Sequence, residues 1–349
     1  MSIAAAPSPA LPALIDAAEL RALLAAPGAE DLLLLDCRFN LADANAGEAA
    51  WRAGHIPGAL YAHLDRDLSG PKVGQGTPAF TGRHPLPSPE ALARTLGQWG
   101  LRPETRVVAY DDAGGMFAAR AWWLLRWLGH ERVQVLDGGW PAWLALGPGG
   151  GPIDTTVATH TPVTVTPVTL TPVTVTPSTV NPQARNGWLV TADEVLASLQ
   201  TSLQTSSQTV SQTVSQTPPG TPGRLQLLDA RAPDRFRGEN ETLDPVGGHI
   251  PGACNRFFQH NLQDGRFKPA EVLRDEFTAL MAQAGASTNT LVHQCGSGVT
   301  ACHNLLAMAH AGFPPTRLYA GSWSEWCADP ARPVQTTAPA SPTAPNGQP

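Results

Sequence analysis

The clearest candidate for chemistry is Cys295, which follows a short apolar run at residues 291–294 and precedes a helical pattern at residues 300–311. Ligands of an open α/β sheet bind at the carboxyl ends of its strands, where this thiol is expected. The glycines at 296 and 298 let the backbone curl, so that several N–H groups point at one centre. These donors and the positive end of the helix would stabilise a thiolate, or a persulfide on the same sulfur. The loop that would supply them comprises Gly296, Ser297, Gly298, Val299 and Thr300.

An internal repeat predicts the architecture that positions this cysteine. The sequence Gly-His-Ile-Pro-Gly-Ala occurs at residues 54–59 and again at 248–253, each time after a Leu-Leu-Asp-x-Arg sequence. Further matches pair residues 106–111 with 290–295 and 136–140 with 319–323, in the same order. The spacing from Asp36 to Gly54 agrees with that from Asp229 to Gly248 to within one residue, as does that from Asp111 to Gly138 with that from Cys295 to Gly321. The chain therefore reads as two copies of one domain, at residues 10–150 and 188–335. Asp111 stands opposite Cys295, so only the second copy has the thiol.

Each copy alternates short apolar runs with helical patterns. In the first copy the runs are residues 32–35, 107–110 and 133–136, and the helical patterns are 89–99 and 117–128. In the second copy the runs are 225–229, 291–294 and 317–319, with helical patterns at 191–199 and 300–311. Short apolar runs suit strands that are buried on both faces. The alternation predicts an α/β fold in which each domain is an open, mostly parallel sheet flanked by helices.

Low-complexity segments separate and interrupt these copies. Residues 151–187 contain a Thr/Val/Pro repeat, which predicts an extended, semi-rigid linker because recurrent proline prevents continuous helix. Residues 200–223 are rich in Ser, Thr and Gln and are interpreted as a solvated loop insertion in the second domain. The tail at 336–349 is expected to be disordered.

The motifs resemble those of the two-domain sulfurtransferases of the rhodanese superfamily, over the whole chain apart from the tail and the two low-complexity segments. The signatures are the repeated Gly-His-Ile-Pro-Gly-Ala, Asp-Ala-Arg at 229–231, Arg-Phe-Arg-Gly at 235–238, Cys-Gly-Ser-Gly-Val-Thr at 295–300 and Gly-Ser-Trp-Ser-Glu-Trp at 321–326. The resemblance implies tandem rhodanese-like domains, the second catalytic and the first a degenerate copy. A carboxylate at position 111 cannot carry a sulfane sulfur, which agrees with that division.

The resemblance also implies roles for individual residues. Arg235 matches the substrate-binding arginine of the family, and Cys295 would hold the persulfide. In the branch that uses 3-mercaptopyruvate, a serine two residues after the cysteine works with a histidine and an aspartate of the first domain. Ser297, His84 and Asp65 fall at the matching positions, and His63 is a weaker competitor for the histidine.

The loop composition favours 3-mercaptopyruvate as the sulfur donor, with thiosulfate as the alternative. The loop after Cys295 has no charged side chain, whereas a cationic loop would help to bind the thiosulfate dianion. One arginine can clamp the single carboxylate of mercaptopyruvate bidentately. Animal relatives have a second arginine before Gly-His-Ile-Pro-Gly, and the stretch at 239–245 has none here. Arg231 or Arg237 could substitute for it.

The same residues fit other kinds of site less well. A Cys-x₅-Arg phosphatase loop would need arginine at Ala301, and a zinc site around Cys295 and Cys302 lacks the tight ligand spacing of structural sites. Cys302, two helical turns after Cys295, is a weak candidate for a resolving thiol. A non-catalytic sulfur carrier or interaction module is the remaining alternative. His55 and His249 occur in both copies, which favours a structural role.

Composition indicates the compartment and the kinds of partner to expect. The chain has 349 residues, a formal net charge of −6 and no basic run, so neither a nucleic-acid groove nor an anionic-membrane patch is expected. Five cysteines make no disulfide framework and favour the reducing cytoplasm. The expected partners are a small-molecule sulfur donor and a thiol or thioredoxin-like acceptor. A monomer without metal or organic cofactor is expected, because the cysteine itself carries the sulfur.

Overall fold

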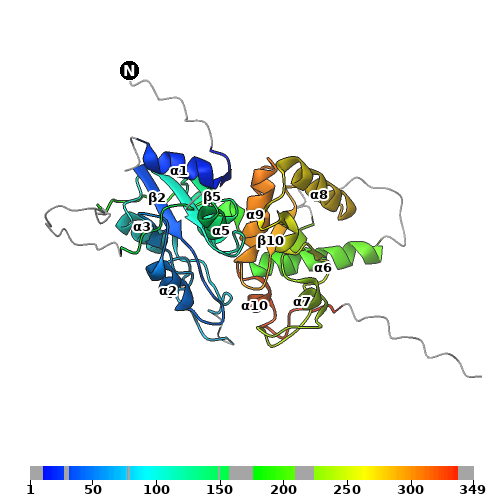
Figure 1. The fold of residues 1–349 in the computed structure, drawn as a ribbon. Helices are drawn as coiled ribbons and strands as arrows, with labels where there is room; N and C mark the ends of the chain where they lie inside the picture. The colour runs from blue at the N-terminus through cyan, green and yellow to red at the C-terminus, as the bar shows by residue number, and fades with distance from the viewer. Residues whose placement is uncertain are drawn as a thin grey trace, which may run out of the picture.

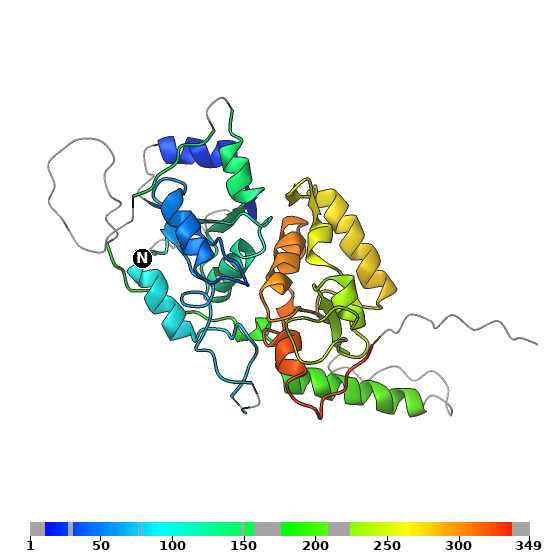
Figure 2. The same ribbon diagram turned by 60° about the horizontal axis from the view of Figure 1, so that its bottom comes forward.

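The computed structural model describes residues 11–26, 31–75, 77, 79–147, 150–156, 176–208 and 224–336. Two α/β units lie side by side, the first in blue to cyan and the second in green to red (Figure 1). The two views agree that α9 (Thr300–His310) lies at the side of the second unit that faces the first (Figures 1 and 2).

The first unit is built on a parallel five-stranded sheet of order β1-β5-β4-β2-β3. Its strands are β1 (Leu14–Ile15), β2 (Leu32–Asp36), β3 (Leu60–Tyr61), β4 (Arg106–Tyr110) and β5 (Val133–Leu136). The central strands β2 and β4 are buried along nearly their whole length, as expected for a sheet with helices on both faces.

Helices flank this sheet, and local sequence signals explain where several of them begin. They are α1 (Ala17–Ala25), α2 (Ala46–Ala53), α3 (Pro89–Gln98), α4 (Ala118–Trp127) and α5 (Gly139–Leu144). The side chains of Asp16 and Ser88 accept backbone N–H groups at the starts of α1 and α3, and Pro89 occupies the first turn of α3.

The second unit repeats the plan with a parallel four-stranded sheet of order β11-β10-β6-β7. Its strands are β6 (Gln226–Asp229), β7 (Cys254–Asn255), β10 (Leu291–Gln294) and β11 (Arg317–Leu318). Its helices are α6 (Ala192–Gln208), α7 (Pro233–Arg237), α8 (Ala270–Gln283), α9 and α10 (Ser322–Trp326). A hairpin of β8 (Leu262–Gln263) and β9 (Arg266–Phe267) and the 3₁₀ turns η2 (Asn186–Trp188) and η3 (Phe258–Asn261) complete it.

The predicted fold class is confirmed, because both units are mostly parallel sheets flanked by helices. The insertion is different from the prediction: α6 continues through Gln208, so the loop expected from residue 200 is wrong over 200–208. Leu196, Leu199 and Leu203 keep a helical spacing that the Ser/Thr/Gln composition obscured. Residues 209–223 of the insertion and the tail from 337 onward lie outside the described residues.

Several described residues of the predicted linker are held by the first unit. Asp154 exchanges backbone hydrogen bonds with His55, and the Ser178 and Gln183 N–H groups donate to carbonyls of Gly97 and Leu128. The repeat at 157–175 lies outside the described residues.

The interface between the units combines apolar packing with hydrogen bonds. Helix α4 packs against α9, and one hydrophobic cluster continues from Trp123 of the first unit to Leu305 of the second. The Phe267 N–H donates to the Asp137 carboxylate at 2.8 Å, and His303 Nε2 lies 3.0 Å from the Gly114 carbonyl. These contacts hold the two units together, so that residues of both can line one site. No described helix is long and apolar enough to cross a membrane.

Candidate active site at the domain interface

Cys295 lies directly after β10 and is only 2% exposed. The start of α10 holds the loop that follows: the Cys295 N–H donates to Ser322 Oγ, and the Trp323 N–H donates to the Cys295 carbonyl. The Gly298 N–H donates to Cys295 Sγ at 3.1 Å. The loop therefore already aims a backbone donor at the sulfur.

Gly298 is required by this turn. Its φ is +77°, and a Cβ placed there would lie 2.4 Å from the Ala320 carbonyl oxygen. Only glycine adopts this conformation without strain or collision. The Gly-rich loop predicted from sequence thus has a geometric cause.

In the first unit, the equivalent loop has an aspartate in place of the cysteine. The carboxylate of Asp111, which follows β4 as Cys295 follows β10, accepts backbone N–H groups of Ala113, Gly115, Phe117 and Ala118 at 2.7–2.9 Å. Burial raises the pKa of Asp111, whereas these four donors lower it. Asp111 is a built-in anion in a nest at a helix N-terminus, so the degenerate copy has its anion site permanently filled.

Ser297, His84 and Asp65 come together across the domain interface. His84 Nδ1 lies 2.7 Å from Ser297 Oγ, and His84 Nε2 lies 3.4 Å from Asp65 Oδ1. With the proton on Nε2, facing Asp65, Nδ1 accepts a hydrogen bond from the Ser297 hydroxyl. The competitor His63 lies elsewhere in this network: its Nδ1 accepts the Asp65 backbone N–H and holds that turn.

Burial and the neighbouring cations keep the His84 ring neutral. Burial is the main cause that lowers the pKa of His84 to about 3, and the Asp65 carboxylate opposes this shift. The cations of Lys72, Arg120 and Arg83 add to the lowering. A neutral imidazole at this position can accept a proton from Ser297.

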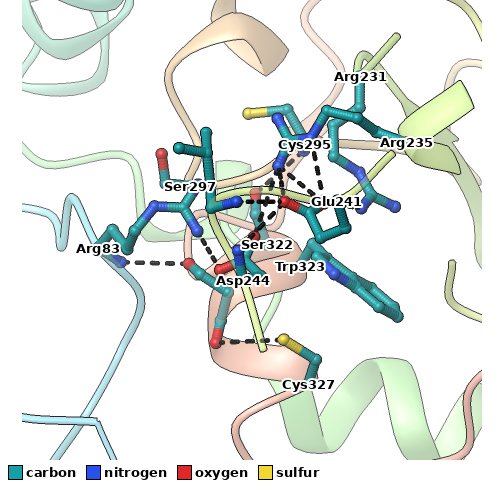
Figure 3. Close-up of polar contacts among 12 residues, drawn as sticks. Arg83, Arg231, Arg235, Glu241, Asp244, Cys295, Ser297, Ser322, Trp323 and Cys327 are labelled. Atoms are coloured by element: carbon teal, nitrogen blue, oxygen red, sulfur yellow. Dashed lines mark hydrogen bonds and ion pairs between the residues drawn. The ribbon is translucent and has the colours of Figure 1, made fainter. Parts of the chain in front are cut away.

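Three arginines, Arg83, Arg231 and Arg235, line the site, and each meets a carboxylate (Figure 3). Arg235 Nη2 lies 2.7 Å from Glu241 Oε1 and 3.6 Å from Asp244 Oδ2. Arg83, from the first unit, donates to the other oxygen of Asp244. Burial raises the pKa of Glu241, but hydrogen bonding from Arg235 holds this pKa below its usual value. Burial raises the pKa of Asp244. The pocket therefore has matched positive and negative charges.

The two arginines expected as substitutes, Arg231 and Arg237, lie in different places. Arg231 lines the cavity, but its guanidinium is committed to Asp229, at 2.7 Å, and to the Gly248 carbonyl. The first unit has the same arrangement in Arg38 and Asp36, which marks it as structural. Arg237 pairs with exposed Glu239 and does not line the cavity. The arginine that sequence reasoning missed is Arg83, although it is the neighbour of the singled-out His84.

The reacting side chains line one small cavity of about 60 Å³. Its walls are Leu41, Arg83, His84, Met116, Arg231, Arg235, Leu243, Cys295, Gly296, Ser297, Val299 and Thr300. A larger interdomain cavity of about 280 Å³ is lined by Trp122, Trp188 and Phe313, but it contains none of the nucleophilic or acid–base residues above. The small cavity is therefore the candidate active site.

His55, His249 and Cys302 have structural surroundings. His55 and His249 lie 2.8 Å from the carbonyls of Trp51 and Phe236, the same arrangement in both units. Cys302 is buried and its thiol donates to the Gly298 carbonyl. Among the described residues no group of His, Cys, Asp and Glu could hold a metal ion.

Comparisons with known proteins agree with this geometry. Residues 16–146 and 219–329 match the Rhodanese-like domain family. The chain is 48% identical over 325 residues to a probable 3-mercaptopyruvate sulfurtransferase of Pseudomonas aeruginosa, covering 93% of this chain and 98% of the relative. It is 38% identical to a putative thiosulfate sulfurtransferase of Mycobacterium tuberculosis, covering 92% and 96%. Its fold is similar to that of a 3-mercaptopyruvate sulfurtransferase of Escherichia coli, with a TM-score of 0.64 at 26% identity, covering 90% and 100%.

Proposed function

This chain belongs to the rhodanese family of sulfurtransferases, and on that premise we propose that it transfers sulfur from 3-mercaptopyruvate to a thiol acceptor through a persulfide on Cys295. The observation that carries the choice of donor is the contact of 2.7 Å between His84 Nδ1 and Ser297 Oγ beside the nucleophile. Mercaptopyruvate needs a proton moved during the reaction, and thiosulfate does not.

The first half-reaction balances as follows. The Cys295 thiolate attacks the donor sulfur, an S–S bond forms, and the C–S bond breaks with its electron pair passing to carbon as pyruvate enolate. The thiol proton of the donor passes to that carbon and gives pyruvate, so the outer sulfur remains as an anionic persulfide. Ser297, backed by neutral His84, is the relay proposed for this proton.

The second half-reaction regenerates the enzyme. An acceptor thiolate attacks the outer sulfur, the Cys–S bond to that sulfur breaks, and the Cys295 thiolate is released while the acceptor becomes a persulfide. Cyanide would accept sulfur in the same way and leave as thiocyanate. A thiol or a thioredoxin-like protein is the acceptor we propose, with the protein acting as a monomer in the cytoplasm.

Arg235 and Arg83 are proposed to take the donor's carboxylate in exchange for Glu241 and Asp244. Both guanidiniums border the cavity, and each already holds a carboxylate of the chain. A monoanionic donor adds one negative charge to these pairs, because Glu241 and Asp244 remain attached to the chain. The thiosulfate dianion would add two.

Steady-state sulfur transfer to cyanide with each donor tests this proposal, with Cys295→Ala as the blank. A preference for mercaptopyruvate in kcat/KM, lost in the blank, is expected. A preference for thiosulfate would select the alternative donor with the same persulfide, and activity with neither would favour a sulfur carrier.

A further inference from the structure

Arg120 differs from the other buried arginines in the part of the chain that the structure describes. It lies near the N-terminal end of α4, and its side chain is fully buried. The other buried arginines, Arg38, Arg231 and Arg256, each form an ion pair with a carboxylate. Arg120 forms no such pair with any described residue, so its charge lacks a counterion there.

The contacts of Arg120 join the two halves of the site. Its Nη1 donates to the Gly298 carbonyl at 3.1 Å, and its Nη2 donates to the His84 carbonyl at 3.3 Å. Its Nε has no hydrogen-bond partner within the described structure. The guanidinium therefore fixes the catalytic loop of the second unit against the His84 segment of the first. Carbonyl oxygens supply hydrogen bonds but do not neutralise the charge, and an arginine keeps its charge when buried.

Two sulfur atoms interact with Arg120: that of Cys302, to which the guanidinium also hydrogen-bonds, and that of Cys295. Burial raises the pKa of Cys302 to about 12, so this thiol remains neutral. Gly298 links the arginine to the remaining sulfur, because its carbonyl accepts from Arg120 while its N–H donates to Cys295 Sγ. Cys295 is therefore the sulfur able to supply a balancing negative charge.

The other charged groups around Cys295 are already balanced, as Figure 3 shows for those it draws. The pairs are Arg83 with Asp244, Arg235 with Glu241 and Arg231 with Asp229. The histidines at 84 and 293 are neutral, because burial lowers the pKa of each to about 3. Among the described residues, Arg120 is the remaining unpaired charge near the sulfur.

We propose that Arg120 is a positioning residue of the sulfur-transfer site, whose charge is balanced by the ionised sulfur of Cys295 and whose guanidinium fixes the loop against the His84 segment. The inference rests on the proposed function in so far as Cys295 is the nucleophile. The thiolate and the anionic persulfide of Cys295 are both charge partners for Arg120. Arg120 therefore stabilises the enzyme both before and after it takes up sulfur.

The test is the pH dependence of Cys295 alkylation by iodoacetamide in the full chain, followed by mass spectrometry of the peptide that contains Cys295. An opposite charge nearby moves an ionisation by about one to three pH units. In Arg120→Met we expect the midpoint of the profile to rise by at least about one unit and the rate near neutral pH to fall about tenfold. Arg120→Lys, which keeps the charge but not the fork, should keep the midpoint near that of the wild type while kcat falls.

Arg126→Met is the matched control, because Arg126 lies on the same helix and pairs with exposed Glu131 away from the site. A folded Arg120→Met protein with the wild-type alkylation profile would overturn the proposal. If Cys295→Ala still transfers sulfur, the proposed function fails instead.

A second measurement needs no Arg120 variant. If the sulfur of Cys295 balances Arg120, the wild type should gain free energy of unfolding relative to Cys295→Ser as the pH rises, because the folded protein then favours the ionised sulfur. A difference that stays constant with pH contradicts the proposal even if Arg120→Met does not fold.

Discussion

His84 of the first unit and Ser297 of the second lie 2.7 Å apart, Nδ1 to Oγ, although they are separated by 213 positions in the chain. This contact places half of the proposed proton relay on the copy that lacks the nucleophilic cysteine. Asp65, Arg83 and Arg120 reach the site from that same copy. The degenerate domain therefore contributes residues to the candidate active site.

Replacing Ser297 by alanine should slow sulfur transfer from mercaptopyruvate and spare transfer from thiosulfate. Removing a group that moves a proton in the transition state costs about one hundred- to ten thousand-fold in rate. Thiosulfate releases sulfite without a proton transfer, so its kcat should change little. The measurement is kcat for both donors, and the same selective loss is expected in His84→Ala.

His63→Ala is the control for the relay, because His63 holds the Asp65 turn through its ring nitrogen and does not contact Ser297. It should retain most of the mercaptopyruvate activity. Equal losses with both donors in Ser297→Ala would show that the serine supports the loop rather than moving a proton.

Asp111→Asn should destabilise the first unit. The carboxylate accepts four backbone N–H groups, and an amide would direct its own N–H₂ group at two of them. Leaving such buried donors unpaired costs about 2–3 kcal/mol in the free energy of unfolding. Urea unfolding measures the loss, with exposed Asp112→Asn as the control. Equal stability of the two variants would mean that water or a local shift replaces the carboxylate.

The sequence was sufficient for the parts of the site that depend on local geometry. A thiol after an apolar strand, with glycines and then a helix, is a local arrangement, and the repeat of 54–59 at 248–253 identified the second copy. Motif positions also led to His84 and Asp65, which the structure brings near Ser297.

Residues that depend on the packing of the two units could not be found in this way. Arg83 and Arg120 become site residues only because the first unit docks on the second. Glu241 and Asp244 lie in a stretch noted in the sequence for its missing arginine, and their pairing with Arg235 follows from the folded path of that loop. No periodicity or spacing marks such contacts in a single sequence.

Acid should destabilise the protein through His293. Burial, aided by the charge of Arg256, lowers the pKa of His293 to about 3 in the folded state. Below the ordinary histidine pKa of about 6.5 the unfolded chain binds a proton that the folded chain refuses, so stability is lost at about 1.4 kcal/mol per pH unit. This loss continues down to about pH 3.

His293→Leu should therefore lose less stability than the wild type between about pH 6.5 and about pH 5, by about 2 kcal/mol. Urea unfolding at both pH values measures the difference, with exposed His260→Leu as the control. Identical pH slopes for the wild type and His293→Leu would contradict the prediction.

Arg235→Ala and Arg237→Ala, two substitutions on the short helix α7, should differ in their effect on the donor. Arg235 borders the cavity, so its loss should raise the KM for mercaptopyruvate about tenfold or more, as expected when a charge-assisted hydrogen bond of about 1.5–3 kcal/mol is removed. Arg237 pairs with Glu239 at the surface, so its loss should leave the KM unchanged.

Glu241→Gln leaves Arg235 with one acidic neighbour fewer and should lower the KM for thiosulfate, because the site then has a spare positive charge. Steady-state kinetics of the three variants gives the KM for both donors and tests these expectations. An increase of KM in Arg237→Ala that matches Arg235→Ala would place the carboxylate site elsewhere on α7.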